Sequence, residues 1–222
     1  MGLYITGDTH GDFSRFNKEP YTSMTKDDIV IICGDFGGLW RKDADHAKKM
    51  EILNSVEFTI LWIDGNHENF DWLNEFEVKE WNGGKVHFIT DKCIHLIRGQ
   101  VFNIEGKNIF TYGGASSVDR MYRIPGVSWW AEELPSWKDE SEALKNLEKC
   151  NYKVDLVITH SAPNNIIYKI NPSYYYDSVT TFLHEIYKKL SFKHWYIGHY
   201  HEDRDITNKV TLLWFDTILE ED

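Results

Sequence analysis

Short apolar runs that end in glycines or in polar side chains recur along this chain. The runs over 3–6, 29–33, 58–63, 154–159 and 194–198 have the length of β-strands. Nearly continuous apolar character is typical of strands that are covered on both faces. From Trp81 to Tyr112, shorter runs broken by glycines predict an antiparallel meander, and one more strand is predicted over 210–216.

Helical patterns lie between and after these runs. Asp43 is predicted to cap a helix that ends near Asn54, and a further helix is expected near 69–76. Ser136 and Ser178 are predicted to cap two more helices, the second with the clearer amphipathic spacing. With βα units first and a meander in the middle, the pattern predicts an α/β or α+β fold.

Composition restricts the class of protein. The chain has 222 residues, of which 42% are hydrophobic, and is expected to form a single domain over 1–222. No apolar stretch approaches the roughly 20 residues of a membrane span, and the first residues lack a basic leader region. We therefore expect a cytoplasmic protein without a membrane partner. The three cysteines are far apart and predict neither a disulfide framework nor a cysteine zinc site.

The formal net charge of −11 disfavours a nucleic-acid partner, because surfaces that track polynucleotides normally carry a basic stripe. Nucleic acid nevertheless stays an alternative, since two bound divalent cations would make a pocket locally positive whatever the global charge. A small phosphorylated molecule is the favoured substrate, and the sequence makes no prediction of oligomeric state.

The polar groups at the ends of the apolar runs are of the kinds that bind metals. In open α/β sheets, ligands gather beyond the carboxyl ends of the strands, so these groups are expected to converge on one point. They are two aspartates, one asparagine and five histidines: Asp8, His10, Asp35, Asn66, His67, His160, His199 and His201.

The order of these groups resembles a known family, the calcineurin-like metallophosphoesterases, in particular its small single-domain members of bacterial and phage type. The family pattern is D-x-H, G-D, G-N-H-[ED], a lone His and G-H-x-H. This chain supplies all five blocks in that order over nearly its whole length. The resemblance implies a two-sheet β-sandwich flanked by helices, with the metal site at the carboxyl ends of strands.

The resemblance also implies a ligand set for two divalent transition-metal ions. One metal is held by Asp8, His10 and His201, the other by Asn66, His160 and His199, with Asp35 between both. Carboxylate, imidazole and amide ligands without thiolate suit Mn, Fe, Zn or Ni, and Mn is the working choice. In the family, a metal-bridging hydroxide attacks phosphorus, while the residue matching His67 stays free of metal and protonates the leaving oxygen.

Two details are predicted from the residues themselves. On a strand, His199 and His201 would point to opposite faces, so both reach one site only in a turn, which Gly198 permits. Arg120 and Arg123, in the long polar loop that follows Tyr112, are candidates for phosphate contacts because a guanidinium fork matches phosphate geometry. Surface arginines on a solvated loop are the competing interpretation.

The predicted function is two-metal hydrolysis of a phosphomonoester or a small phosphodiester. The main alternative is a nuclease or a phosphatase that processes nucleic-acid ends. A phosphoprotein phosphatase ranks lower, because the G-D-x-x-D-R-G block of those enzymes is replaced by Gly-Asp-Phe-Gly-Gly at 34–38. A metal-bound scaffold without activity also ranks lower, because the ligand set and His67 are all present.

Overall fold

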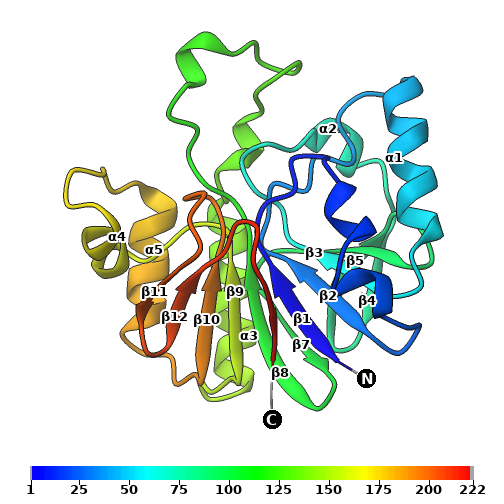
Figure 1. Ribbon diagram of the computed structural model, residues 1–222. Helices are drawn as coiled ribbons and strands as arrows, with labels where there is room; N and C mark the ends of the chain where they lie inside the picture. The colour runs from blue at the N-terminus through cyan, green and yellow to red at the C-terminus, as the bar shows by residue number, and fades with distance from the viewer. Residues whose placement is uncertain (1, 221–222) are drawn as a thin grey trace.

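The computed structural model describes residues 2–220 and packs two β-sheets face to face, with helices on both outer sides (Figure 1). The first sheet has the order β13-β1-β2-β3-β6-β5-β4, with β1 (Leu3–Thr6), β2 (Ile29–Ile32), β3 (Thr59–Trp62), β4 (Val78–Trp81), β5 (Gly84–Phe88), β6 (Cys93–Leu96) and β13 (Thr217–Leu219). The second has the order β11-β12-β10-β9-β8-β7, with β7 (Gln100–Ile104), β8 (Lys107–Tyr112), β9 (Leu156–Thr159), β10 (His194–Ile197), β11 (Arg204–Thr207) and β12 (Val210–Leu212). The predicted two-sheet α/β sandwich is confirmed.

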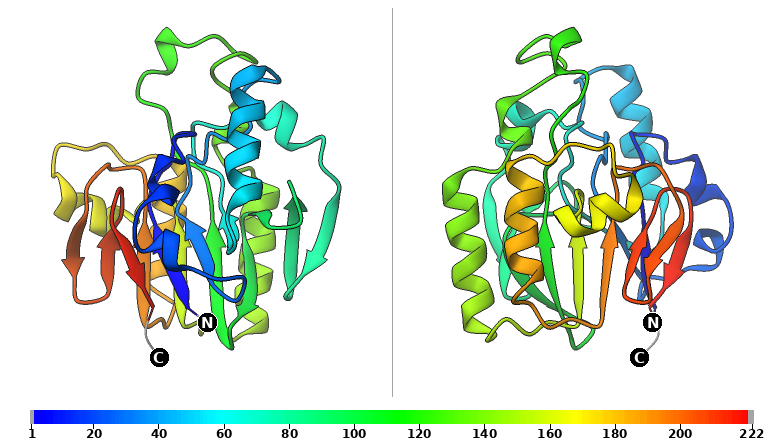
Figure 2. Two further views of the ribbon diagram at one scale, coloured as in Figure 1. Left: turned by 45° about the vertical axis from the view of Figure 1, so that its right-hand side comes forward. Right: turned by 90° about the vertical axis from the view of Figure 1, so that its left-hand side faces the viewer.

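Helices cover the outer face of each sheet (Figure 2). The first sheet packs against α1 (Ala44–Ser55), α2 (Phe70–Leu73) and the 3-10 turns η1 (Ser14–Asn17) and η2 (Tyr21–Ser23). The second packs against α3 (Trp137–Lys149), α4 (Asn164–Ile170) and α5 (Ser178–Tyr187). A third apolar cluster, which includes Leu61, Phe102 and Ile158, fills the space between the sheets. The predicted strands are apolar throughout because both of their faces are buried.

The parallel strands at the middle of each sheet fix where the polar groups emerge. β1, β2 and β3 pair in parallel in the first sheet, as do β9 and β10 in the second. Their carboxyl ends therefore open at one end of the sandwich. Above that end a long connection, from Gly113 to Ser136, rises away from the body; it includes η3 (Arg120–Tyr122) and η4 (Ala131–Glu133) (Figure 1).

The prediction of one continuous meander between Trp81 and Tyr112 is wrong. β5 and β6 form a hairpin in the first sheet, where β6 also runs parallel to β3, whereas β7 and β8 form a hairpin in the second. The chain changes sheets between them. Each hairpin then turns an apolar face into the space between the sheets, and an unbroken meander in one sheet could not bury both faces there.

Only the first three residues of the predicted strand over 210–216 form a strand, β12. The backbone N–H groups of Trp214, Phe215 and Asp216 donate to the carboxylate of Asp203 and hold a turn after β12. The chain then crosses over, and β13 pairs antiparallel with β1. The short elements β4, β11, β13 and α4 were not predicted from the sequence.

Of the three N-cap residues predicted from the sequence, two are observed and one is wrong. Asp43 caps α1 and Ser136 caps α3, as predicted. The cap of α5 is Asp177 rather than Ser178: the Asp177 carboxylate accepts the backbone N–H of Thr180, and the Thr180 hydroxyl accepts the N–H of Asp177. This reciprocal pair satisfies two backbone donors, so the helix starts at Ser178, one residue earlier than a Ser178 cap would allow.

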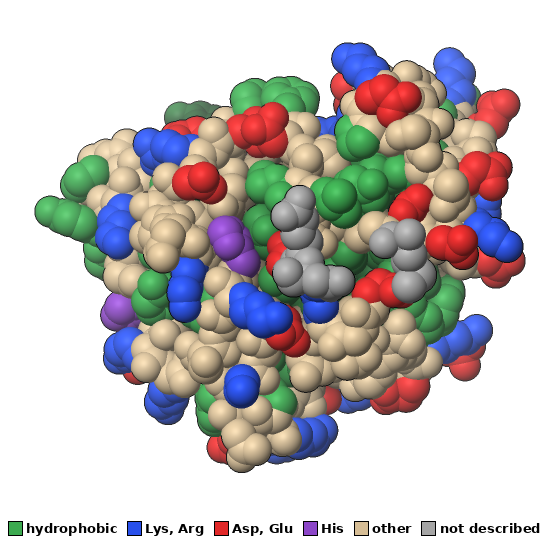
Figure 3. All heavy atoms as spheres, turned by 60° about the horizontal axis from the view of Figure 1, so that its bottom comes forward, with side chains coloured by type: hydrophobic (Ala, Val, Ile, Leu, Met, Phe, Trp, Pro, Cys, Tyr) green, Lys and Arg blue, Asp and Glu red, His purple; other side chains and the backbone are tan. Residues whose placement is uncertain are grey.

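At the end of the sandwich away from the projecting connection, basic and acidic side chains are interspersed (Figure 3). Among the helices that the structure describes, none combines the length and the apolar character needed to cross a membrane.

Candidate metal centre

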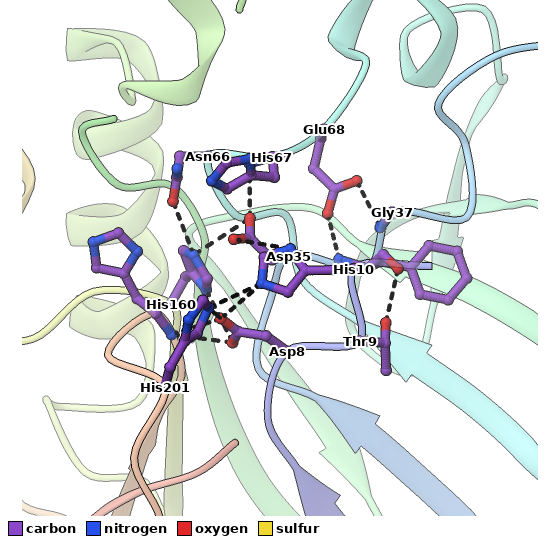
Figure 4. Close-up of polar contacts among 12 residues, drawn as sticks. Asp8, Thr9, His10, Asp35, Gly37, Asn66, His67, Glu68, His160 and His201 are labelled. Atoms are coloured by element: carbon purple, nitrogen blue, oxygen red, sulfur yellow. Dashed lines mark hydrogen bonds and ion pairs between the residues drawn. The ribbon is translucent and has the colours of Figure 1, made fainter. Parts of the chain in front are cut away.

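Two sets of three donor atoms meet at the carboxyl ends of the strands (Figure 4). The first set, here called the first trio, contains Asp8 Oδ2, His10 Nε2 and His201 Nε2. The imidazole nitrogens lie 2.9 Å apart, and Asp8 Oδ2 lies 3.7 Å from His10 Nε2 and 3.2 Å from His201 Nε2. Both histidines are exposed, so the first trio is open to solvent.

The second trio is buried. It contains Asp35 Oδ1, Asn66 Oδ1 and His160 Nε2, with the imidazole nitrogen 3.4 Å from the carboxylate oxygen and 3.2 Å from the amide oxygen. The other carboxylate oxygen, Asp35 Oδ2, lies 3.8 Å from His10 Nδ1. Each oxygen of Asp35 therefore lies near a histidine of a different trio.

His199 lies at the edge of this arrangement. Its ring centroid is 4.9 Å from that of His160, and its backbone N–H donates to both carboxylate oxygens of Asp8. Burial, and after it the neighbouring His160, lowers the pKa of His199 to about 4, so its imidazole is neutral and retains a lone pair at neutral pH.

Four of these residues have a left-handed backbone. The φ angles are 47° at His10, 46° at Asp35, 70° at His199 and 50° at His201. Non-glycine residues seldom adopt this region, and such strain concentrates at functional sites where the surrounding structure enforces it. The predicted turn at 198–201 is present, and it brings both of its histidines to the cluster.

Glycines let the backbone approach the carboxylates. A Cβ at position 65 would collide with Asp35 Oδ1, and a Cβ at position 198 would collide with Asp8 Oδ1 and the carbonyl oxygen of Cys33. Only glycine fits these two positions while the acidic side chains keep their places.

The buried carboxylates of the two trios need cations to compensate their negative charge. The carboxylates of Asp8 and Asp35 are about 1% exposed, and no lysine or arginine within residues 2–220 forms an ion pair with either. Burial opposes protonation of His160, yet Asp35 and Asp8 raise its pKa to about 10. Buried carboxylates are costly unless a positive charge compensates them. Oxygen and imidazole donors in this arrangement fit divalent metal ions.

Hydrogen bonds behind the second trio orient its donor atoms. His160 Nδ1 donates to the carbonyl oxygen of Cys33 at 2.8 Å, which leaves Nε2 to face the trio. Asn66 Nδ2 donates to Ser117 Oγ at 3.1 Å, which turns the amide oxygen inward. Ser117 is held in turn by the buried carboxylate of Glu133, which accepts its hydroxyl at 2.6 Å and its backbone N–H at 3.0 Å.

The loop that carries Asp35 is fixed in a similar way. The buried carboxylate of Glu68 accepts the backbone N–H of Phe36 at 2.7 Å, and Asp35 Oδ1 accepts the N–H of His67 at 2.7 Å. Burial, together with the charge of Asp35, raises the pKa of Glu68 well above its usual range. The connections after β2 and β3 are thus tied to one another through their own side chains.

Comparison with known proteins identifies the family. The model of the calcineurin-like phosphoesterase family matches residues 1–203. The chain is a calcineurin-like phosphoesterase. As a member of this family it is a metal-dependent hydrolase of phosphoester bonds, and the resemblance seen in the sequence is confirmed.

Among solved structures, the phosphopantetheinyl hydrolase (PptH) from Mycobacterium tuberculosis is similar at 14% sequence identity, over 96% of this chain and 88% of that one, with a TM-score of 0.42. Among curated proteins, none matches the chain.

His67 of the phosphoesterase lies beside both trios without belonging to either. Its ring centroid is 5.4 Å from that of His10, and its Nε2 lies 3.3 Å from Arg123 Nη2. An arginine only donates, so His67 Nε2 is the acceptor and carries no proton in this contact. Burial lowers the pKa of His67; the charge of Asp35 opposes this, and that of Arg123 adds to it.

The structure separates the two candidate arginines. Arg123 is held by a two-pronged ion pair with Asp119, at 2.7 and 2.8 Å, which aims its guanidinium at His67. The guanidinium of Arg120 instead lies 4.2 Å from the ring centroid of Trp129, and the residue is exposed. Of these two arginines, Arg123 is the one that contacts His67.

Replacing Arg123 by Ala is expected to lower kcat/KM without loss of metal. The loss of transition-state stabilisation should be about 1.5–3 kcal/mol, the scale of a charge-assisted hydrogen bond. Removal of its charge also raises the pKa of His67. Activity that needs the protonated imidazole is present below that pKa and lost above it, so the high-pH fall in the rate profile should move to higher pH. Arg120→Ala is the matched control, and equal losses in the two variants would contradict this assignment.

The sequence did not single out three residues that the structure places here. Ser117 and Glu133 orient Asn66, and Lys49 of α1 lines an open cleft of about 200 Å³ together with His10, Trp40 and His67. A serine and a glutamate 16 positions apart in a loop give no pattern, and Lys49 is one of many charged residues on a polar helix. Their roles follow from tertiary contacts alone.

Ser117→Ala is expected to weaken metal binding at the second trio by about 10- to 100-fold, the usual effect of losing a hydrogen bond that orients a ligand. Without the hydroxyl, the Asn66 amide can turn its nitrogen toward the trio. Calorimetric titration with Mn²⁺ measures the change, with Ser55→Ala at the exposed end of α1 as control. Unchanged affinity at both sites would show that Ser117 does not position Asn66.

Proposed function

We propose that this chain hydrolyses a phosphomonoester or a small phosphodiester with two divalent metal ions. The observation that supports this most directly is the position of the Asp35 carboxylate, which has one oxygen in the second trio and the other 3.8 Å from His10 of the first. Two nearby cations repel each other unless an anionic group lies between them, and Asp35 is placed to be that group.

We propose that the residues of the two trios are the metal ligands. Asp8, His10 and His201 would hold one ion; Asn66 and His160, with His199 from the edge, would hold the other. Mn²⁺ is the first metal to test among the Mn, Fe, Zn and Ni ions that a donor set without thiolate suits. When bound, the ions supply Lewis acidity, which lowers the pKa of water and neutralises charge on the phosphate oxygens.

The protein's own side chains position the ester and handle the proton. His67 is the proposed proton donor to the leaving oxygen, and it must be protonated to act. Arg123, braced by Asp119, approaches His67 from the projecting connection, where a bound phosphate oxygen could compete for its guanidinium. Lys49 adds a positive charge to the cleft on the side of His10.

A small substrate fits this site better than a polynucleotide. The cleft at the first trio has a volume of about 200 Å³, and the chain carries a net charge of −11. Long-range attraction for nucleic acid is therefore weak, and recognition depends on contacts near the phosphate.

A substrate panel tests the proposal. The chain, stripped of metal and reloaded with Mn²⁺, is assayed on p-nitrophenyl phosphate, bis-p-nitrophenyl phosphate, a cyclic nucleotide and single-stranded DNA. We expect metal-dependent turnover of one of the small esters and little cleavage of DNA. Turnover of DNA alone would favour the nuclease alternative, and no turnover of any substrate with metal present would contradict the proposal.

A further inference from the structure

A second and larger pocket borders the metal centre. Its volume is about 440 Å³, which is within the range of small-molecule sites, roughly 300–1,000 Å³. Three consecutive residues from the connection between α4 and α5, Tyr174, Tyr175 and Tyr176, contribute to its lining, and Val118 contributes from the projecting connection. We call it the tyrosine pocket.

The tyrosine pocket adjoins the metal centre. His199, at the edge of the second trio, lines it directly. Ser161, which directly follows His160, and Ser116, which directly precedes Ser117, also line it. A molecule whose phosphate lies at the trios can therefore extend into this pocket.

The lining is aromatic. Tyr174 and Tyr200 are stacked with their ring centroids 6.1 Å apart and their planes 17° apart. The Tyr200 hydroxyl accepts the backbone N–H of Ala162, so its polar end is used within the protein and its ring is left for packing. Tyr174, Tyr175 and Tyr176 are 45%, 95% and 52% exposed. A row of exposed aromatic side chains is more often a binding surface than a chance feature.

The charge of the lining selects against anions. Among the lining residues there is no lysine or arginine, and the one carboxylate, Asp177, already caps α5 through the N–H of Thr180 at 2.8 Å. This contrasts with the cleft at the first trio, which contains Lys49. A second phosphate or a carboxylate in the tyrosine pocket would meet a negative charge without a compensating cation.

We infer that the tyrosine pocket binds a neutral, ring-bearing organic group that is esterified to the phosphate at the metal centre. The inference rests on the proposed function, to which it adds a substrate class: esters whose organic part carries a flat apolar ring and no further anion. In a monoester this group is on the leaving oxygen, whereas in a diester it can be on either oxygen.

The test compares esters that differ only in the ring. 2-Phenylethyl phosphate and ethyl phosphate have similar alkyl leaving groups, and the methyl diesters of the same alcohols form a second pair. With Mn²⁺, we expect kcat/KM to favour the ring-bearing ester by about tenfold in at least one pair, the scale of one aromatic contact. Tyr174→Ala and Tyr176→Ala should move that ratio toward one. The matched control is Tyr168→Ala, an exposed tyrosine of α4 outside the lining.

Binding without metal gives an independent readout. 2-Phenylethanol, observed by saturation-transfer NMR with the metal-free chain, should bind to the wild type and the Tyr168→Ala variant, and more weakly to the two pocket variants. If no ester is hydrolysed, the proposed function is contradicted. The binding of 2-phenylethanol then still tests whether the tyrosine pocket binds a ring. A ratio near one in both pairs, or ratios and binding that the pocket variants leave unchanged, would overturn the inference.

Discussion

Replacement of Asp35 by Asn is expected to abolish binding of both metal ions and to lower kcat/KM by about 10³-fold or more. The factor corresponds to the several kcal/mol that metal ions contribute to transition-state stabilisation. Asp35 Oδ1 lies 3.4 Å from His160 Nε2 and Oδ2 lies 3.8 Å from His10 Nδ1, so its charge acts on both trios. An amide keeps the shape but removes that charge.

Asp8→Asn provides the comparison, because Asp8 Oδ2 lies in the first trio, whereas Oδ1 faces the His160 nitrogen that donates to the Cys33 carbonyl, at 3.8 Å. We expect this variant to lose chiefly one ion, as measured by elemental analysis and calorimetric titration with Mn²⁺. Asp91→Asn, at an exposed position between β5 and β6, controls for the chemical change itself. If Asp8→Asn emptied both sites and Asp35→Asn emptied neither, Asp35 would not be the shared ligand.

His67→Asn is expected to retain both metal ions and to slow turnover by about 10²–10⁴-fold, the usual range for a positioned proton donor. His67 lies beside the trios but is part of neither, so its loss removes proton transfer rather than a ligand. The defect should be largest for alkyl esters and smallest for nitrophenyl esters, whose leaving oxygen needs no proton.

His184→Asn, on α5 and away from the centre, is the matched control. Turnover of an alkyl and a nitrophenyl ester is measured for each variant together with its metal content. A His67→Asn protein that lost metal would make His67 a ligand, and equal defects on the two esters would exclude a role in protonating the leaving group.

The strands could be predicted, and so could the meeting of polar side chains at their ends. Both follow from the burial of the strands on two faces. Strands buried on two faces must be apolar, so the point where each one ends is visible as a change to glycine and polar residues, as at Ile63 and Ile197. Parallel strands present those ends on one side. The turn at Gly198 was also predictable, since two histidines separated by one residue reach the same site only if the strand has ended.

Other features depend on tertiary contacts that leave no local pattern. The runs that form β5 to β8 read as one meander, and only the need to bury both hairpins between the sheets divides them. The partnership of Ser117 with Glu133, and the difference between Arg120 and Arg123, depend on how the projecting connection folds. The tyrosines at 174–176 line a pocket only because the fold places His199 and the projecting connection next to them.

The most direct test of the central claim is an anomalous-scattering map from crystals of the chain grown with Mn²⁺. The account predicts two peaks per chain, about 3.5–4 Å apart, with the Asp35 carboxylate between them. The first trio should contact one peak, and Asn66, His160 and His199 the other. A single peak, or two peaks that Asp35 does not join, would contradict the two-metal centre proposed for this phosphoesterase.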